Sequence, residues 1–207
     1  ILAGDILPLY HRFKWESILE LAGQYTNRVF YCPGNHCFYG KNLETNKDIL
    51  DELNKSFSYL KVLQRNVVFH VKGYKIIGTT GWYTSGLDIK DKCNDFTFIP
   101  DIENWVISEA KADIKFLTEQ EANLIVTHHM PSHFCVNEKY KNSDNQVFYV
   151  NNWFDKLNKK PKAIIFGHTH NKFYGYKSGV LLTNNPLGYP WENKSREAFN
   201  PNETLII

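Results

Sequence analysis

Hydrophobic positions along the chain form two kinds of pattern. Four stretches have apolar residues three or four positions apart, which predicts helices over residues 14–24, 46–60, 102–121 and 147–159. Continuous apolar runs predict buried strands over residues 28–32, 124–127 and 164–166. The alternation of strands with helices is typical of an α/β fold.

Two hairpins are predicted around short turns that contain glycine. The first pairs residues 67–71 with 74–78, and the second pairs 172–176 with 180–183. A last strand is predicted over residues 204–207. Residues 79–100 have little periodicity, and an irregular loop of this length indicates a function.

Polar side chains follow four of the apolar runs at the point where each run ends. They are Asp5, Asn35 with His36, His128, and His168 with His170. In extended backbone, side chains two positions apart point to the same side, so the last two imidazoles can share one cleft. Ligands bind at such strand ends in α/β sheets, and we expect one sheet edge to gather all of these groups.

A mixture of carboxylate, amide oxygen and imidazole suits borderline divalent ions such as Mn, Fe, Zn, Co or Ni. With few cysteines in the set, a structural zinc site is disfavoured. Simpler roles stay open for each residue taken alone. Asp5 can cap a helix, Asn35 can stabilise a turn, and the histidines can be buried and hydrogen-bonded.

Composition narrows the class of protein. The 207 residues fit a single domain with a substantial core, and a net charge of +2 is too balanced to indicate nucleic-acid binding, although it does not exclude a nucleic-acid substrate. No apolar run has the length of a membrane span and no signal-peptide pattern opens the chain, so we expect a cytoplasmic protein. Four scattered cysteines are expected to be reduced thiols.

The motifs together resemble those of the calcineurin-like metallophosphoesterases. That family has, in order, D-x-H, G-D, G-N-H, a histidine at a strand end, and G-H-x-H. The last four are matched here by Gly4-Asp5, Gly34-Asn35-His36, His128 and Gly167-His168-Thr169-His170. The segments 127–131 and 185–190 resemble forms seen in bacterial and phage members, so the similarity extends over nearly the whole chain.

The resemblance implies a dinuclear metal centre. Its ligands would be Asp5, Asn35, His128, His168 and His170, with Asp5 bridging the two ions. His36 would lie over the phosphate, with Asn35 also near it, and would assist departure of the leaving group. The resemblance also implies a four-layer sandwich of two mixed sheets flanked by helices.

The implied activity is metal-dependent hydrolysis of a phosphomonoester or phosphodiester by a water that bridges two divalent ions, with Mn favoured. Substrates would be a phosphorylated small molecule, a nucleotide or a phosphoprotein, and no membrane partner is expected. The alternative is a non-catalytic scaffold of the same fold that binds a protein. A metallo-β-lactamase-type hydrolase is set aside because the sequence after His170 lacks the required acid.

Two departures from the family pattern stand out. No aspartate is followed two residues later by histidine, so the first motif is absent. Because Ile1 opens directly into an apolar run, we expect that the chain is cut from a longer one and holds at best one well-formed metal site. Cys37 stands where many relatives have an acid, and we interpret it as a packed thiol.

Other residues near these motifs have open roles. His129 is expected to support the metal ligands or to lie at the cleft rim. His11 and His133 lie in predicted loops. The sequence is equally compatible with their exposure to solvent and with their orientation into the cleft. Trp82 and Tyr83 could form a substrate wall, but packing is the more common role for such aromatic side chains.

Overall fold

Two β-sheets organise the computed structural model, which describes residues 1–206. The small sheet has three parallel strands in sequence order, β1 (Leu2–Ala3), β2 (Val29–Cys32) and β3 (Leu60–Val62). The larger sheet is mixed and has the order β4-β5-β6-β7-β9-β8. Its strands are β4 (Phe69–Val71), β5 (Tyr74–Thr79), β6 (Leu124–Thr127), β7 (Ala163–Ile165), β8 (Phe173–Lys177) and β9 (Val180–Asn184).

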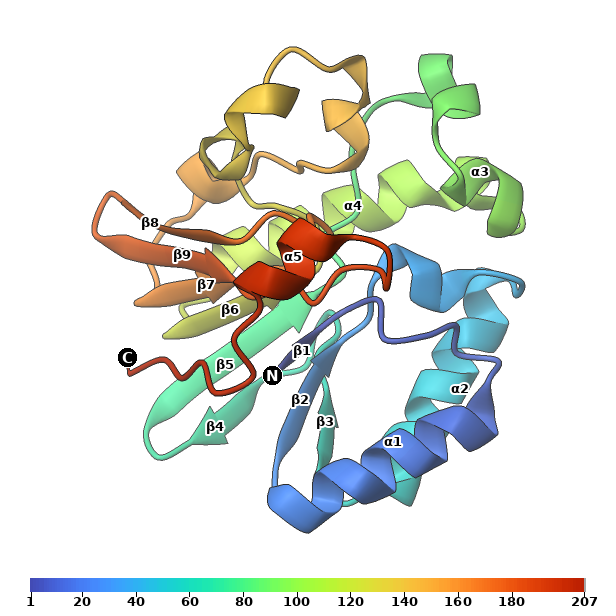
Figure 1. The fold of residues 1–207 in the computed structure, drawn as a ribbon, viewed down its shortest axis with the longest axis vertical. Helices are drawn as coiled ribbons and strands as arrows, with labels where there is room; N and C mark the ends of the chain where they lie inside the picture. Colours follow the sequence, from blue (N-terminus) through green and yellow to red (C-terminus); the bar gives the residue numbers. More distant parts are fainter. Residues whose placement is uncertain (207) are drawn as a thin grey trace.

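Helices cover the outer faces of both sheets (Figure 1). α1 (Arg12–Tyr25) and α2 (Leu43–Ser56) lie against the small sheet, and their Leu19, Leu50 and Leu53 belong to its buried core. α4 (Ile102–Glu119) places Val106 in that same core and Leu117 in the core of the larger sheet. The short helix α3 (Asp95–Phe98) lies next to α4, and α5 (Asn193–Ala198) lies in front of the larger sheet in the view of Figure 1.

A separate buried cluster joins the two sheets. Phe30 of β2 meets Phe69 of β4 edge to face, with ring centroids 5.6 Å apart, and the thiol of Cys32 donates to the carbonyl oxygen of Thr79 at 3.0 Å. The central strand β6 is buried at all four residues because it has neighbours on both edges and covered faces. The α/β fold of two sheets flanked by helices is therefore confirmed.

Most predicted elements are present, and three predictions are wrong. Residues 147–159 are not one helix but two 3₁₀ turns, Asp144–Phe148 and Phe154–Lys156, joined by irregular backbone. The helix predicted to reach residue 60 ends at Ser56, because residues 60–62 pair with β2 as a third strand. No strand is assigned over residues 204–206, and residue 207 lies outside the described residues.

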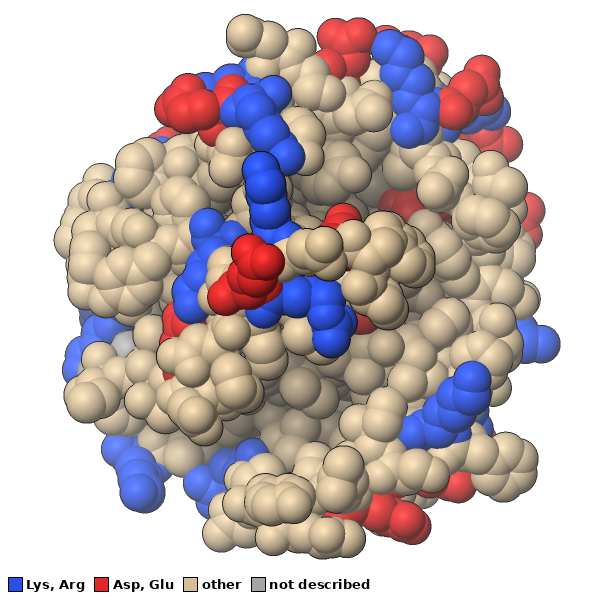
Figure 2. Space-filling view, viewed as in Figure 1, with Lys and Arg blue, Asp and Glu red and all other residues tan. Residues whose placement is uncertain are grey.

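Charges of both signs are intermixed on the face drawn in Figure 2, in keeping with the net charge of +2. Blue and red side chains lie together over α5, with uncharged surface around them. No helix among residues 1–206 is long and apolar enough to span a membrane. All four cysteines are free thiols, as expected.

Candidate metal centre

The four polar strand ends meet where the two sheets face each other. Asp5 and Asn35 follow β1 and β2 of the small sheet, whereas His128 and His168 follow β6 and β7 of the larger one. The expectation of a single sheet edge is therefore wrong, because the group is shared between two sheets. Parallel pairing within each sheet brings the carboxyl ends of neighbouring strands together, and packing of the sheets closes the group.

Four side-chain atoms converge on one point. Nε2 of His128 lies 3.1 Å from Oδ2 of Asp5, 3.0 Å from Oδ1 of Asn35 and 3.1 Å from Nδ1 of His168. Among residues 1–206, Asp5, His128 and His168 are the acidic, histidine or cysteine side chains grouped closely enough to hold a metal ion. With Asn35, these are the residues that the family resemblance implied as ligands of one ion.

Hydrogen bonds on the far side of each ligand determine which atoms face this point. Nδ1 of His128 donates to the carbonyl oxygen of Ala3 at 2.8 Å, and Nε2 of His168 donates to that of Phe148 at 3.1 Å. The atoms that surround Nε2 of His128 therefore present lone pairs to it. They are Oδ2 of Asp5, Oδ1 of Asn35 and Nδ1 of His168. One proton can bridge only two of these atoms, whereas a cation can contact all four. The donor set fits a borderline divalent ion.

The electrostatics of the group also favour a cation. Burial alone would lower the pKa of His128, but the charge and hydrogen bond of Asp5 outweigh it and raise that pKa. Burial alone would raise the pKa of Asp5, but His128 and His36 lower it below its usual value. Burial, together with His129 and His128, holds the pKa of His168 well below its usual range, so this ring is neutral. Asp5 therefore favours positive charge at the centre of the group, and a metal would compete with a proton for this position.

The backbone at the centre is strained, and side chains of the group lie very close to it. Asp5 and His168 have φ of 51° and 64°, a region that favours glycine and is found at functional sites. A Cβ on Gly34 would lie 2.2 Å from Oδ1 of Asp5, and one on Gly4 would lie 2.1 Å from Nδ1 of His128. Only glycine fits at these two positions, which explains why glycine precedes Asp5 and Asn35.

Asp95 is a buried acid of the centre that sequence reasoning missed. Its Oδ1 accepts a hydrogen bond from Nδ2 of Asn35 at 2.7 Å and another from the hydroxyl of Tyr39 at 3.0 Å. Because Nδ2 is used in this way, the amide oxygen of Asn35 turns toward His128. Asp95 lies in the irregular 79–100 stretch, whose length was the one sequence signal that could have pointed to it.

The other two predicted site residues lie beside the group rather than in it. The backbone N–H of His36 donates to Oδ1 of Asp5 at 3.0 Å, and its Nδ1 lies 3.4 Å from the hydroxyl of Tyr189. Nδ1 of His170 pairs with Oε2 of Glu192 at 2.6 Å, and its ring stands edge to face with Tyr189. His170 is thus separate from the other four predicted ligands, and Glu192 and Tyr189 were not predicted.

Comparison with known proteins identifies the family. A model of the calcineurin-like phosphoesterases matches residues 1–172. The chain belongs to this family. Calcineurin-like phosphoesterases are hydrolases of phosphate esters that generally depend on divalent metals. The candidate metal site here is formed by Asp5, Asn35, His128 and His168, which we call the Asp5 group. No curated protein matches the sequence.

A solved structure shares the fold of this calcineurin-like phosphoesterase. Phosphopantetheinyl hydrolase from Mycobacterium tuberculosis matches with a TM-score of 0.70 at 16% identity, over 97% of this chain and 81% of its own. A putative 5'-nucleotidase from Staphylococcus aureus, solved in complex with alpha-ketoglutarate, matches with a TM-score of 0.42 at 15% identity. That match covers 83% of this chain and 34% of the nucleotidase.

Side chains with open roles in the sequence now have definite places. His129 is fully buried, not at a rim; it donates from Nδ1 to the carbonyl oxygen of Thr80 and lies against His168 with ring centroids 4.4 Å apart. Burial lowers the pKa of His129 to about 3. Trp82 and Tyr83 are packed, and Cys37 is a buried thiol that accepts from the hydroxyl of Tyr31 at 2.9 Å.

The two loop histidines do not join the centre. His133 is exposed and its Nδ1 lies 3.1 Å from Oε1 of Gln146. His11 is half-buried and packs on the ring of Tyr10. Neither residue is therefore assigned a role in this phosphoesterase.

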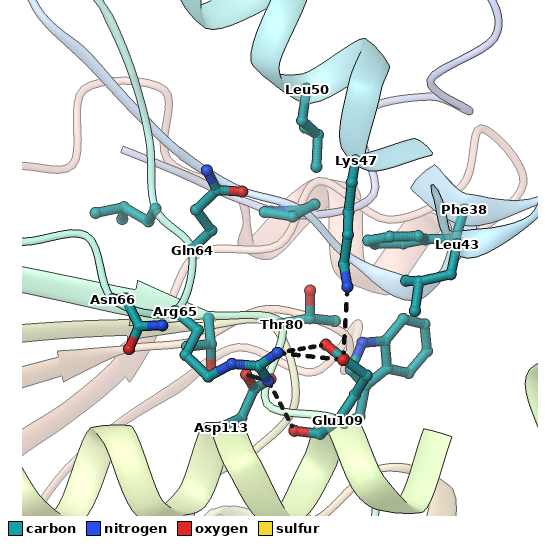
Figure 3. Close-up of a pocket in the computed structure, with 14 residues that line it drawn as sticks. Phe38, Leu43, Lys47, Leu50, Gln64, Arg65, Asn66, Thr80, Glu109 and Asp113 are labelled. Atoms are coloured by element: carbon teal, nitrogen blue, oxygen red, sulfur yellow. Dashed lines mark hydrogen bonds and ion pairs between the residues drawn. The ribbon is translucent and has the colours of Figure 1, made fainter. Parts of the chain in front are cut away.

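A cavity of about 160 Å³ lies between α2, α4 and the ends of β3 and β5 (Figure 3). Its charged side chains are paired with one another. Arg65 bonds both Glu109 and Asp113, at 3.0 Å and 3.2 Å, and Lys47 lies 3.5 Å from Glu109. The Asp5 group is not part of its lining, so the candidate chemistry of this phosphoesterase lies elsewhere.

Proposed function

We propose that this protein is a metal-dependent phosphoesterase that hydrolyses a phosphomonoester or phosphodiester by direct attack of water. The observation that carries the proposal is the convergence of Asp5, Asn35, His128 and His168 on one point at about hydrogen-bond distance. The family match supports the reaction class. Substrates proposed on this basis are phosphorylated small molecules, nucleotides or phosphoproteins.

The residues of the chain have distinct roles in this proposal. Asp5, Asn35, His128 and His168 hold one divalent ion, for which Mn²⁺ is favoured, and His170 serves a second one. When bound, such ions lower the pKa of water and neutralise charge on phosphoryl oxygens. Asn35 contributes a neutral ligand and lies near the phosphate, as does His36.

His36 assists departure of the leaving group in this proposal. Its backbone N–H is fixed on Asp5, and its ring stacks on Tyr39 with centroids 4.5 Å apart, which limits the orientations of the imidazole. A positioned histidine can donate a proton to a departing alkoxide as the bond to phosphorus breaks. The ring is half-exposed, so a substrate can reach it.

Metal binding and hydrolysis test the proposal. The metal-free chain is titrated with Mn²⁺ in a calorimeter and assayed with p-nitrophenyl phosphate and bis(p-nitrophenyl) phosphate. His168→Asn is expected to weaken Mn²⁺ binding at least tenfold, whereas His70→Asn, which changes an exposed histidine of β4, leaves it unchanged.

The outcome separates the proposal from its alternative. Binding of Mn²⁺ together with turnover of either ester supports the phosphoesterase. If the chain neither binds the ion nor hydrolyses either ester, the proposal fails and the non-catalytic scaffold replaces it.

A further inference from the structure

A continuous row of aromatic rings passes through His36. Phe98 stacks on Tyr39, Tyr39 on His36, and Tyr189 on Trp191, with ring centroids 5.2, 4.5 and 4.9 Å apart. The rings of His36 and Tyr189 connect these two sets of stacked rings, with centroids 6.4 Å apart. The interplanar angles between neighbouring rings lie between 17° and 30°, so each ring is stacked on the next. We call Phe98, Tyr39, His36, Tyr189 and Trp191 the aromatic row.

Packing does not account for this row. Trp191 is 74% exposed and Phe98 is 50% exposed, although both belong to residue types that proteins usually bury. The row draws on three segments distant in the sequence, residues 36–39, α3 and the 185–192 segment before α5. Because stacked rings cover each other's faces, the row leaves uncovered the outer faces of its end rings, Phe98 and Trp191, and a flat, apolar group can stack there.

The row lies beside the candidate metal centre. His36 takes part in both, because its backbone contacts Asp5 while its ring belongs to the row. Tyr189 also touches His170 edge to face, with ring centroids 4.8 Å apart. If His36 assists the leaving group, as in the proposed function, Tyr39 and Tyr189 are the aromatic side chains next to that group.

We propose that the aromatic row binds a planar ring in the organic part of the phosphoester, so that the preferred substrates carry a heteroaromatic or aryl group beyond the scissile bond. This inference rests on the proposed function for the position of the phosphate. Trp191 supplies the most accessible stacking face of the row, and Tyr189 holds Trp191 in place. A substrate with the same phosphate and sugar but no ring lacks this contact.

Tryptophan fluorescence measures ring binding without any metal or turnover. Of the five tryptophans, Trp15, Trp82 and Trp153 are buried and Trp105 is half-buried, so Trp191 is the one that solvent and ligands reach freely. Adenosine 5'-monophosphate is added to the metal-free chain, and ribose 5-phosphate serves as the ring-free control. Quenching is expected with the first ligand and not with the second.

Variants test whether the contact is with the row. Trp191→Leu keeps an apolar side chain but removes the ring, and is expected to weaken binding of adenosine 5'-monophosphate about tenfold by calorimetry. Trp191→Phe restores a stacking face and recovers most of the affinity. Phe13→Ala removes an equally exposed ring on α1, away from the row, and leaves the affinity unchanged.

The outcomes distinguish failure of this inference from failure of the proposed function. If adenosine 5'-monophosphate and ribose 5-phosphate bind with the same affinity, or if Trp191→Leu has no effect, the ring site is wrong even where Mn²⁺-dependent hydrolysis is present. If ring binding depends on Trp191 while no ester is hydrolysed, the row is a ring-binding site and the phosphoesterase proposal falls.

Discussion

Asp95 occupies a position where a single hydrogen bond decides which atom of Asn35 reaches the candidate metal centre. An amide presents either an oxygen that can bind a metal or an NH₂ that cannot. The carboxylate at 2.7 Å accepts from the NH₂, so the oxygen faces His128. Residues that orient ligands in this way change metal affinity although they do not touch the metal.

Replacing Asp95 by Asn should weaken Mn²⁺ binding ten- to 100-fold. The new side chain has the same shape but loses the charge that fixes the amide of Asn35. Calorimetric titration of Mn²⁺ measures the change, and Asp91→Asn, an exposed acid four residues earlier, is the matched control. Equal losses in both variants, or none in Asp95→Asn, would show that Asp95 does not orient the ligand.

His36→Ala should lower kcat about 100-fold or more for an alkyl phosphate ester and only a few-fold for p-nitrophenyl phosphate. An alkoxide must gain a proton as it departs, whereas p-nitrophenolate is stable without one. Steady-state rates with the two esters give the comparison, and His133→Ala changes an exposed histidine as the control. A similar loss for both esters would contradict the assigned role.

The residues that converge at the candidate metal centre could be singled out from the sequence, but the side chains that support them could not. Asp5 and His128 each follow an apolar run and match a short motif, so local patterns reveal them. Asp95 and Glu192 reach their partners from 60 and 22 positions away, through loops without periodicity. Such contacts arise from tertiary packing, which local hydrophobic patterns do not encode.

Among the elements, α2 has a side-chain cap that can be tested directly. Oδ1 of Asn42 accepts the backbone N–H of Thr45 at 2.9 Å and thereby satisfies one free donor of the first turn. Asn42→Ala should lower the free energy of unfolding by about 1 kcal/mol, while Asn42→Asp keeps an acceptor and should cost little. Urea denaturation gives both values; an equal loss for Asp and Ala would count against the cap.

Element prediction succeeded where burial follows a regular pattern. Strand β6 coincides with the apolar run 124–127, and the two hairpins form at their glycine turns. The helix predicted over 147–159 fails because tertiary contacts overrule its periodicity. Asn151 donates to the carbonyl oxygen of Gly81, and Val150 bridges Met130, so the backbone follows neighbouring segments and not its own spacing.

At the scale of the whole molecule, we propose that the chain forms one domain. The cluster that contains Phe30 and Val126 belongs to both sheets, so neither sheet has its complete core without the other. A single transition is expected in scanning calorimetry, with the calorimetric and van't Hoff enthalpies equal. Two resolved transitions would mean that the sheets unfold separately.

Asp113 should make global stability depend on pH. Burial raises its pKa to about 7, against the lowering effect of Arg65, from an ordinary 3.8. The folded state therefore holds this proton more tightly than the unfolded chain between pH 4 and 7, and the contribution of Asp113 to the free energy of unfolding falls as pH rises through that range. The full effect is at most about 4 kcal/mol, at about 1.4 kcal/mol for each pKa unit.

Asp113→Asn should flatten this dependence, because the amide stays neutral and can still accept the backbone N–H of Gly81. Urea denaturation at a series of pH values from 4 to 8 measures the slope. Asp88→Asn, which changes an exposed acid, should keep the slope of the parent protein. An unaltered slope in Asp113→Asn would show that another group determines the pH dependence.

The three glycines around His128 have a consequence for the order of folding. Added Cβ atoms on Gly4, Gly34 and Gly167 would all lie within 3 Å of its ring. These residues and His128 are distant in the sequence, so the niche around the ring closes only after the two sheets dock. A metal ion held by this centre would therefore bind only after the two sheets have docked. Such an ion would stabilise the docked state alone, so its binding would report assembly of the whole domain.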